Sequence, residues 1–203
     1  MMMLLLGCRA DVLALIAAVC VVAGGTACVA SPVRDNPPFP SVPTKFSGNI
    51  VEDIESDGSK FQLVGTVYVD WDRNLTRLDY TSEDTLATQF QDYSAGSAFV
   101  VTFDEEFAPQ CTTLPITWPI GNPAALGNAT FFGLEEFANR ICNTWYFVTP
   151  AKDLLYFFFD VTSSSLAGMQ IKSPALNYTL AYTTLDATAP KQSAFHVPSV
   201  CQG

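Results

Sequence analysis

Hydrophobic and polar side chains alternate along most of the chain after residue 45, which is typical of β-strands with one buried face. In residues 61–70, for example, Phe61, Leu63, Val67 and Val69 fall on one face. In residues 46–54, one face holds Phe46, Gly48, Ile50, Glu52 and Ile54. Further strands are predicted at residues 73–80, 86–93, 97–103, 111–118, 144–148, 154–161, 166–171 and 178–185.

Turn signals separate these segments. An Asp-Gly pair at Asp57-Gly58 predicts a tight turn between the first two strands. Residues 133–141 (GLEEFANRI) are the one stretch in this part of the chain for which we expect a short helix. About ten strands with turns every 8–12 residues favour an all-β sandwich, half-barrel or barrel.

Aromatic residues concentrate in residues 144–148 and 154–161, which hold seven of the chain's 25 aromatic side chains. The second run is far too short to cross a bilayer. Because successive side chains of a strand point to opposite faces, the four aromatics of residues 156–159 require both faces to be covered. We expect one alternate pair to line a cavity and the other to be buried against protein. The pairs are Tyr156 with Phe158, and Phe157 with Phe159.

The first thirty residues have the pattern of a cleaved secretory signal. Arg9 precedes an apolar stretch at residues 12–22, and small residues follow. Cleavage after Ala27 would retain Cys28, and cleavage after Ala30 would remove it. We therefore expect a leader at residues 1–30, a Pro-rich extended segment at residues 31–45 and one domain at residues 46–203.

The chain is acidic and carries three glycosylation sequons. It has 20 Asp and Glu against 10 Lys and Arg, and because Asp11 and Arg9 both lie in the leader, the remainder keeps the net charge of −10. This balance argues against nucleic acids and anionic membrane surfaces as electrostatically driven partners. The sequons at Asn74, Asn128 and Asn177, behind a secretory signal, indicate a glycoprotein that is extracellular or lysosomal.

The chain lacks the usual catalytic patterns. His196 is the only histidine, so nucleophilic catalysis has a single candidate base, in an extended tail, and zinc ligands are too few. We therefore predict a protein that is not an enzyme. Carboxylates occur together in three places, where turns would leave them solvated. A catalytic pair of the kind that glycosidases use remains an alternative. These places are Asp70 with Asp72, Asp104 with Glu105 and Glu106, and Glu135 with Glu136.

The cysteines allow more than one disulfide arrangement. After the leader the chain retains Cys111, Cys142 and Cys201, with Cys28 depending on the cleavage site. An exported chain favours disulfides. The spacing alone does not choose the pair.

Several segments together resemble the ependymin-related family in their order along the chain. They are Phe46-Ser47-Gly48 after the prolines, residues 65–79 (GTVYVDWDRNLTRLD), residues 98–117 (AFVVTFDEEFAPQCTTLPIT), residues 144–153 (TWYFVTPAKD) and residues 195–202 (FHVPSVCQ). The family commonly has another cysteine soon after the central tryptophan strand, where this chain has Leu154 and Leu155, so that bridge is not expected here.

The resemblance implies a lipoprotein-carrier-like fold, in which a curved antiparallel sheet, or two stacked sheets, form a half-barrel around a deep apolar pocket with at most one or two short helices. It also implies a disulfide between Cys111 and Cys201, leaving Cys142 buried and inert, bonded to Cys28, or in an intermolecular bridge. Homodimers and calcium association are further implications. Candidate calcium ligands are Asp104, Glu105 and Glu106, or Glu52, Asp53, Glu55 and Asp57.

Two functions follow as hypotheses. The first is non-enzymatic binding of a lipid or other amphiphile, because large aromatics line cavities as readily as they fill cores. The predicted pocket residues are Phe132, Trp145, Phe147, Tyr156, Phe157, Phe158 and Phe159. The second is a glycosylated matrix or adhesion protein with no small-molecule ligand, which would have a filled interior. An enzyme would need two convergent carboxylates in a pocket.

Overall fold

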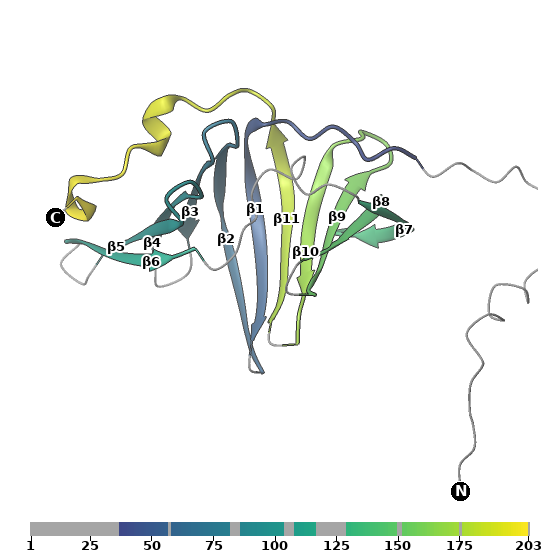
Figure 1. The fold of residues 1–203 in the computed structure, drawn as a ribbon, viewed down its shortest axis with the longest axis horizontal. Coiled ribbons are helices and arrows are strands. Elements are labelled where there is room, and N and C mark those ends of the chain that lie inside the picture. Colours follow the sequence, from purple (N-terminus) through teal and green to yellow (C-terminus); the bar gives the residue numbers. More distant parts are fainter. Residues whose placement is uncertain are drawn as a thin grey trace, which may run out of the picture. The chain divides into compact units, whose positions relative to one another are not determined.

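A computed structural model describes residues 37–56, 58–81, 86–103, 108–116, 129–149, 152–174 and 176–202. These residues form eleven strands and two short 3-10 helices (Figure 1). The strands are β1 (Lys45–Ser56), β2 (Ser59–Asp70), β3 (Leu75–Thr81), β4 (Leu86–Asp92), β5 (Ser97–Phe103), β6 (Pro109–Pro115), β7 (Thr130–Phe137), β8 (Arg140–Val148), β9 (Leu154–Asp160), β10 (Leu166–Lys172) and β11 (Leu176–Asp186). The helices are η2 (Gln192–Phe195) and η3 (Ser199–Cys201).

All eleven strands belong to one open, curved antiparallel sheet, with the order β6-β5-β4-β3-β2-β1-β11-β10-β9-β8-β7. Strands β1 to β6 form one meander and β7 to β11 form a second. The two meanders meet where β1 pairs with β11, from Ser47 opposite Asp186 to Ser56 opposite Leu176. The predicted all-β fold built on a curved antiparallel sheet is confirmed.

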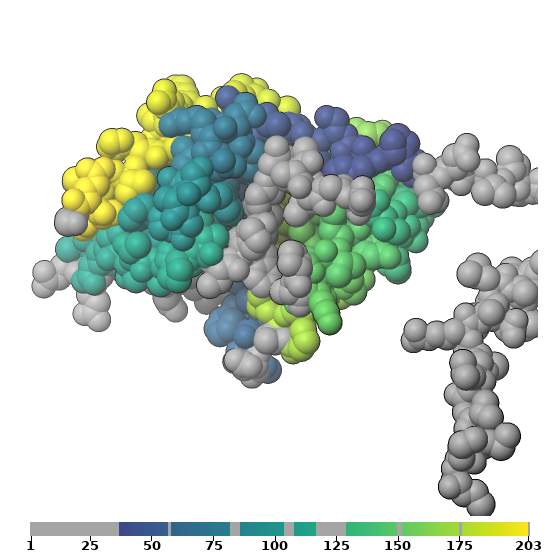
Figure 2. All heavy atoms as spheres, viewed as in Figure 1, coloured from purple at the N-terminus to yellow at the C-terminus, as the bar shows by residue number. Residues whose placement is uncertain are grey.

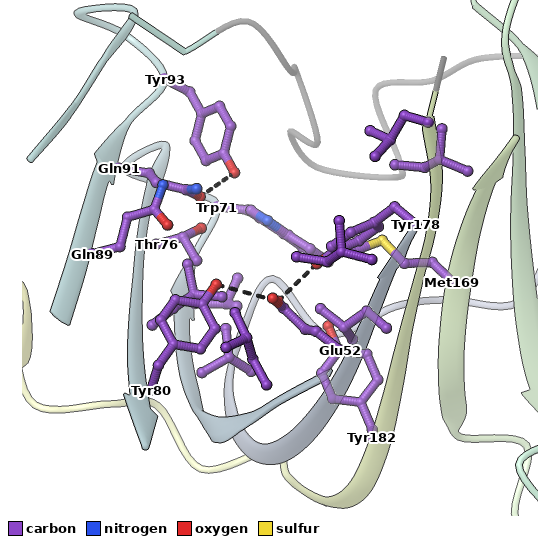
Figure 3. Close-up of a pocket in the computed structure, with 18 residues that line it drawn as sticks. Glu52, Trp71, Thr76, Tyr80, Gln89, Gln91, Tyr93, Met169, Tyr178 and Tyr182 are labelled. Atoms are coloured by element: carbon purple, nitrogen blue, oxygen red, sulfur yellow. Dashed lines mark hydrogen bonds between the residues drawn. The ribbon is translucent and has the colours of Figure 1, made fainter. Parts of the chain in front are cut away.

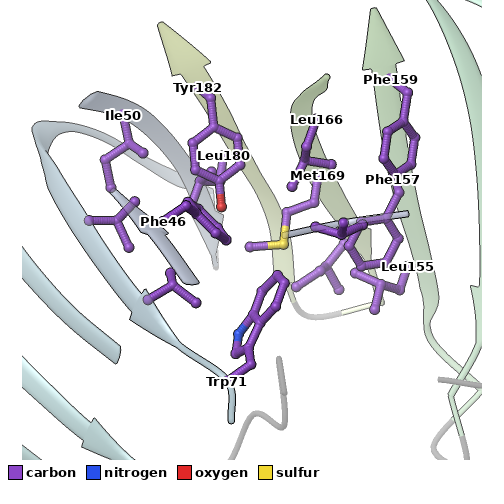
Figure 4. Packing of buried hydrophobic residues seen from close by; sticks show 14 of the residues in the cluster. Phe46, Ile50, Trp71, Leu155, Phe157, Phe159, Leu166, Met169, Leu180 and Tyr182 are labelled. Atoms are coloured by element: carbon purple, nitrogen blue, oxygen red, sulfur yellow. The ribbon is translucent and has the colours of Figure 1, made fainter. Parts of the chain in front are cut away.

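Residues that alternate along each strand lie on opposite faces of this sheet. We call the face that carries Phe46, Ile50, Val67 and Leu78 the inner face, and the opposite one the outer face. The main hydrophobic cluster lies on the inner face and extends across both meanders. In Figure 4, Met169 of β10 lies between Phe46 of β1 and Phe157 of β9.

The described part of the Pro-rich segment, residues 37–44, packs against part of the inner face. Phe39 makes edge-to-face contacts with Trp145, Phe147, Phe157 and Phe159, at ring-centroid distances of 5.8, 5.6, 6.2 and 5.4 Å. In the space-filling view this segment, in purple, lies along the green strands of the second meander (Figure 2). We call the part of the inner face that these four rings of β8 and β9 form the aromatic half. The ring of Phe39 packs on it.

A second, smaller cluster covers the outer face of β9. Phe158 stacks on Phe137 at 4.0 Å, and Cys142 and Ala167 complete the cluster. Phe137 also lies over Gly168, where a Cβ atom would overlap the phenyl ring and the carbonyl oxygen of Leu180. Both faces of the aromatic run are therefore covered, as its sequence requires.

The predicted helix at residues 133–141 is wrong. These residues form the end of β7, a two-residue turn and the start of β8. Ala138 and Asn139 have φ angles of 49° and 60°, the left-handed values that a type I′ hairpin turn needs. Pairing with β8 satisfies the backbone and buries Phe137, which an isolated short helix would not do.

The C-terminal tail returns from β11 across the first meander. Arg77 donates a hydrogen bond from Nη1 to the carbonyl oxygen of Ala194 at 3.0 Å, and its guanidinium lies over the rings of Tyr68 and Phe90. These three side chains are directly opposite one another on the outer face. Figure 2 shows the yellow tail against the blue and teal strands.

A disulfide fixes the end of this tail. Cys201 in η3 is bonded to Cys111 on the edge strand β6, with 5.3 Å between their Cα atoms. This is the pairing that the family resemblance implied. No helix among the described residues is long and apolar enough to span a membrane.

Candidate ligand-binding cavity

A cavity of about 490 Å³ opens on the inner face of the first meander and the adjoining strands β10 and β11. The strand register places its lining side chains together, because Val67, Leu78 and Gln89 are directly opposite one another on β2, β3 and β4. The apolar lining residues are Ile54, Leu63, Val67, Val69, Trp71, Leu78, Met169, Ile171, Leu176 and Leu180. The lining residues with polar groups are Glu52, Thr76, Tyr80, Gln89, Gln91, Tyr93, Tyr178 and Tyr182.

Glu52 is the charged residue of the cavity. It lies on β1 with only 2% of its surface exposed, and Figure 3 shows its carboxylate directed toward two tyrosines from different strands. The hydroxyl of Tyr178 on β11 donates a hydrogen bond to Glu52 Oε1 at 2.7 Å, and the hydroxyl of Tyr80 on β3 donates to the same oxygen at 3.3 Å. The carboxylate thus joins strands of both meanders.

Burial governs the acid–base properties of this group. Loss of water raises the pKa of Glu52 above its ordinary value of 4.5, and the hydrogen bonds from Tyr178 and then Tyr80 lower it by a smaller amount. Burial, reinforced by the charge of Glu52, also raises the pKa values of Tyr80, Tyr178 and Tyr182. These tyrosines therefore stay protonated and act as hydrogen-bond donors.

A second polar group lies on the β4 side of the cavity. The hydroxyl of Tyr93 donates to Oε1 of Gln91 at 2.7 Å, and burial raises the pKa of Tyr93 to about 12. Gln89 and Thr76 lie on the same lining (Figure 3). The cavity therefore combines apolar walls with a few oriented polar groups, the composition typical of small-molecule sites.

The predicted pocket residues do not line this cavity. Trp145, Phe147, Phe157 and Phe159 form the aromatic half, which Phe39 fills. Phe158 is buried in the outer cluster. Tyr156 and the exposed Phe132 contact each other on the outer face, 5.9 Å apart.

Sequence reasoning missed Glu52 as a pocket residue, although a signal was present. On β1 it lies in phase with Ile50 and Ile54, so the alternation itself placed a carboxylate on the buried face. A charged residue in the apolar phase of a strand needs a partner or a function. The tyrosine partners come from strands 28 and 126 residues away along the chain, which a local pattern cannot reveal.

The described carboxylates do not gather into a metal site. No group of three or more His, Cys, Asp or Glu side chains that could hold a metal ion is found among the residues that the structure describes. Glu52 points into the cavity, Asp53 accepts a hydrogen bond from Gln62, and Glu55 pairs with Lys60. The calcium candidates Asp104, Glu105, Glu106 and Asp57 lie outside the described residues.

The two described carboxylate pairs of the sequence lie outside the cavity. Asp70 and Asp72 both pair with Lys45, at 3.7 and 3.2 Å. Glu135 and Glu136 are successive residues of β7 and so point to opposite faces. Neither pair lines the cavity.

Two of the three sequons fall on described, exposed residues. Asn74 lies in the turn between β2 and β3, where its side-chain amide donates to Ser94 Oγ at 3.2 Å. Asn177 lies near the start of β11, and Asn128 is outside the described residues. His196 is exposed in the tail.

Cys142 has a free thiol that is completely buried. Burial raises its pKa, and the charge of Asp160 raises it further. A thiol held in its neutral form is a poor nucleophile.

Comparison with known proteins gives structural neighbours only. No protein-family model matches the chain, and no curated protein matches it. Among solved structures, an uncharacterized conserved protein from Thermus thermophilus is 8% identical over 77% of this chain and 86% of its own, with a TM-score of 0.47.

Two further neighbours have similar values. The MucA/MucB complex of Pseudomonas aeruginosa gives 16% identity over 78% of this chain, a little over half (57%) of the matched chain, and a TM-score of 0.43. A putative outer membrane lipoprotein-sorting protein domain from Vibrio parahaemolyticus gives 7% identity over 75% of this chain and 89% of its own, with a TM-score of 0.41. None of these values assigns a function to this chain.

Proposed function

We propose that this chain is a non-enzymatic binding protein for a hydrophobic or amphiphilic ligand, such as a lipid, held in the inner-face cavity. The observation that carries the proposal is the cavity itself. Its volume of about 490 Å³ lies within the range of small-molecule sites, roughly 300–1,000 Å³. Ten of its eighteen lining residues are apolar, so a hydrocarbon chain would gain about 0.8 kcal/mol for each methylene group that leaves water.

The distribution of charge supports binding over catalysis. A glycosidase-type mechanism needs two carboxylates that face each other across the substrate. Among the described lining residues there is one carboxylate, that of Glu52. Its tyrosine neighbours are held as hydrogen-bond donors, which suits recognition of a polar group.

The alternative of a glycosylated matrix or adhesion protein would be favoured by a filled interior. The aromatic half is filled, but the first meander retains a cavity well above ~300 Å³. The exposed sequons at Asn74 and Asn177 are compatible with either function. The cavity therefore favours the ligand carrier.

We further propose that the chain is an exported glycoprotein related to the ependymin family. The leader pattern and the sequons support export and glycosylation, and the Cys111–Cys201 bond agrees with the pairing that the family resemblance implies. Homodimer formation and calcium association at Asp104–Glu106 remain predictions of the resemblance. Analytical ultracentrifugation and calcium titration of the purified protein would test them.

Ligand binding is tested by placing a large side chain on one face or the other of β2. Leu63 lines the cavity, whereas its neighbour Val64 points to the outer face and is 51% exposed. We expect the wild-type protein to bind the neutral hydrophobic dye Nile red saturably. Leu63→Trp should weaken binding by about tenfold or more, the equivalent of ~1.4 kcal/mol, because the indole occupies ligand space.

The matched variant Val64→Trp adds the same ring to the other face and should bind as the wild type does. Equal affinities for all three proteins would place the dye elsewhere and contradict the proposal. So would the absence of saturable binding to the wild type, together with native mass spectra free of any co-purifying amphiphile.

A further inference from the structure

The cavity contains an acidic side chain without a basic counterpart. None of the described lining residues is a Lys, Arg or His. The titratable groups that face Glu52 from the surrounding strands are the phenols of Tyr80, Tyr178 and Tyr182, with Tyr93 farther along the lining. A buried carboxylate is ordinarily stabilised by a cation, and the described part of the lining supplies none to Glu52.

The two carboxylate oxygens of Glu52 have different environments. Oε1 accepts both phenol hydrogen bonds, from Tyr178 at 2.7 Å and from Tyr80 at 3.3 Å. Oε2 makes no hydrogen bond to any described residue. The tyrosines therefore fix the orientation of the carboxylate, and the described residues leave its other oxygen available within the lining of the cavity.

Neutral phenols offset only part of the cost of burying a negative charge. A ligand that brings a positive charge to Oε2 would supply the missing compensation through a charge-assisted hydrogen bond. A ligand carboxylate at the same place would add like-charge repulsion in a medium of low dielectric constant. A hydroxyl could donate a hydrogen bond but would carry no charge.

We propose that the cavity selects amphiphiles with a cationic amine at their polar end, which is received by Oε2 of Glu52, over carboxylates of the same chain length. This inference rests on the proposed ligand-binding function and specifies its ligand class. Tyr80 and Tyr178 act as positioning residues, because they hold the carboxylate through its other oxygen. The apolar walls accept the alkyl chain without regard to its head group.

The test compares three ligands with one alkyl chain. Dodecylamine, dodecanol and dodecanoate would compete with Nile red at neutral pH on the wild-type protein. We expect the affinity for dodecylamine to exceed the affinity for dodecanoate by about tenfold or more. The affinity for dodecanol should lie between them. This ranking needs no variant, so it tests the inference even if a substitution impairs folding.

Glu52→Gln then identifies the residue responsible. The glutamine can still accept the tyrosine hydrogen bonds, but it removes the charge. We expect the variant to bind dodecylamine about tenfold more weakly than the wild type does, and to bind dodecanoate at least as well. Asp53→Asn is the matched control, since it makes the same change of charge one residue away on the exposed outer face.

The pH dependence separates recognition from a purely structural role. Because protonation of Glu52 removes the negative charge, dodecylamine affinity for the wild type should fall as the pH is lowered through the raised pKa of Glu52. In Glu52→Gln this component should be absent. A carboxylate that only supported the tyrosines would give no such dependence on the ligand's charge.

Each outcome bears on one claim. Equal wild-type affinities for dodecylamine and dodecanoate would overturn the inference, as would an amine preference that persists in Glu52→Gln, while saturable Nile red binding would leave the carrier function intact. If neither Nile red nor any of the three ligands binds, the proposed function itself fails.

Discussion

The titration of the buried Glu52 carboxylate links the cavity to the stability of the fold. The raised pKa of Glu52 means that the folded protein holds this proton to a higher pH than the unfolded chain, which releases it near 4.5. Between these two pH values the folded state binds more protons. The free energy of unfolding therefore falls as the pH rises through this window.

Glu52→Gln should remove this dependence. We expect the unfolding free energy of the variant, relative to that of the wild type, to increase from pH 4.5 up to the raised pKa and then to stay constant. Urea denaturation at a series of pH values measures the difference. A difference that does not change with pH would show that Glu52 titrates as it does in the unfolded chain.

Asp160→Asn is a control, because Asp160 should change the free energy of unfolding with pH in the opposite direction. Backbone N–H groups of Ser163 and Thr162 bond Asp160 and lower its pKa below 3.8, so this exposed carboxylate stabilises the fold above that value and loses its effect on acidification. The asparagine variant should therefore differ most from the wild type at neutral pH and least in strong acid.

Phe39 provides a second prediction at the residue scale. Its ring contacts all four rings of the aromatic half, and truncation would leave a void there. Phe39→Ala should lower the free energy of unfolding by about 3 kcal/mol, the low end for a phenylalanine because the ring is partly exposed. Urea denaturation measures the loss.

Phe103→Ala, at a residue 47% exposed at the end of β5, is the comparison and should cost about 0.5 kcal/mol. A similar loss in both variants would mean that the Pro-rich segment does not cover the aromatic half in solution.

Residue roles were predictable from the sequence only where they depend on local alternation. The two-sided burial of residues 156–159 follows from period two, and the structure has Phe157 on the inner face and Phe158 on the outer face. Whether an inner-face ring lines a void or meets another ring depends on Phe39, more than a hundred residues earlier in the chain. The sequence therefore predicted burial of these aromatics but placed the pocket at the wrong end of the sheet.

At the scale of single elements, strands were predictable where alternation is continuous and less so where it is interrupted. β1 and β2 were predicted within two residues of their ends, because the alternation of side chains continues through most of each strand. β7 was missed. Gly133 has a φ angle of 140° and lies at a register shift with β8, which breaks the alternation between Phe131 and Leu134.

The turn after β7 gives a prediction at this scale. Ala138 has a positive φ angle, which costs an alanine about 1 kcal/mol and a glycine almost nothing. Ala138→Gly should therefore stabilise the protein by about 0.5–1 kcal/mol in thermal or urea unfolding. The same substitution in a strand, Ala87→Gly in β4, should destabilise it by a similar amount. Destabilisation at both positions would contradict the type I′ turn.

At the scale of the whole molecule, the disulfide closes a long covalent loop. Cys111 and Cys201 are 90 residues apart, so the bond restricts the unfolded chain strongly. The double variant Cys111→Ser with Cys201→Ser should lose about 2–5 kcal/mol of unfolding free energy. Reduction of the wild type should give the same loss and should have no effect on the double variant. A wild type that is insensitive to reductant would contradict the bond.

The order of the strands was beyond sequence reasoning for a physical reason. Hairpin neighbours such as β1 and β2 follow from short turns, but the pairing of β1 with β11 joins segments about 130 residues apart. Nothing local in either strand specifies the other. The cavity inherits this property, since its lining comes from β1 to β4 on one side and β10 and β11 on the other.

The pairing of β1 with β11 also implies an order in which the sheet can assemble during synthesis. The first meander can fold while the chain is still emerging from the ribosome, because its contacts are between sequence neighbours. Strand β1 lies at the edge of this meander until β11 has been made and pairs with it. Glu52 gains its hydrogen bond from Tyr178 at the same stage. A chain that stops before β10 would therefore expose the apolar inner face of the first meander, with Glu52 bonded to Tyr80 alone among its two tyrosine partners, so the lining of the cavity is complete only once β10 and β11 have been made.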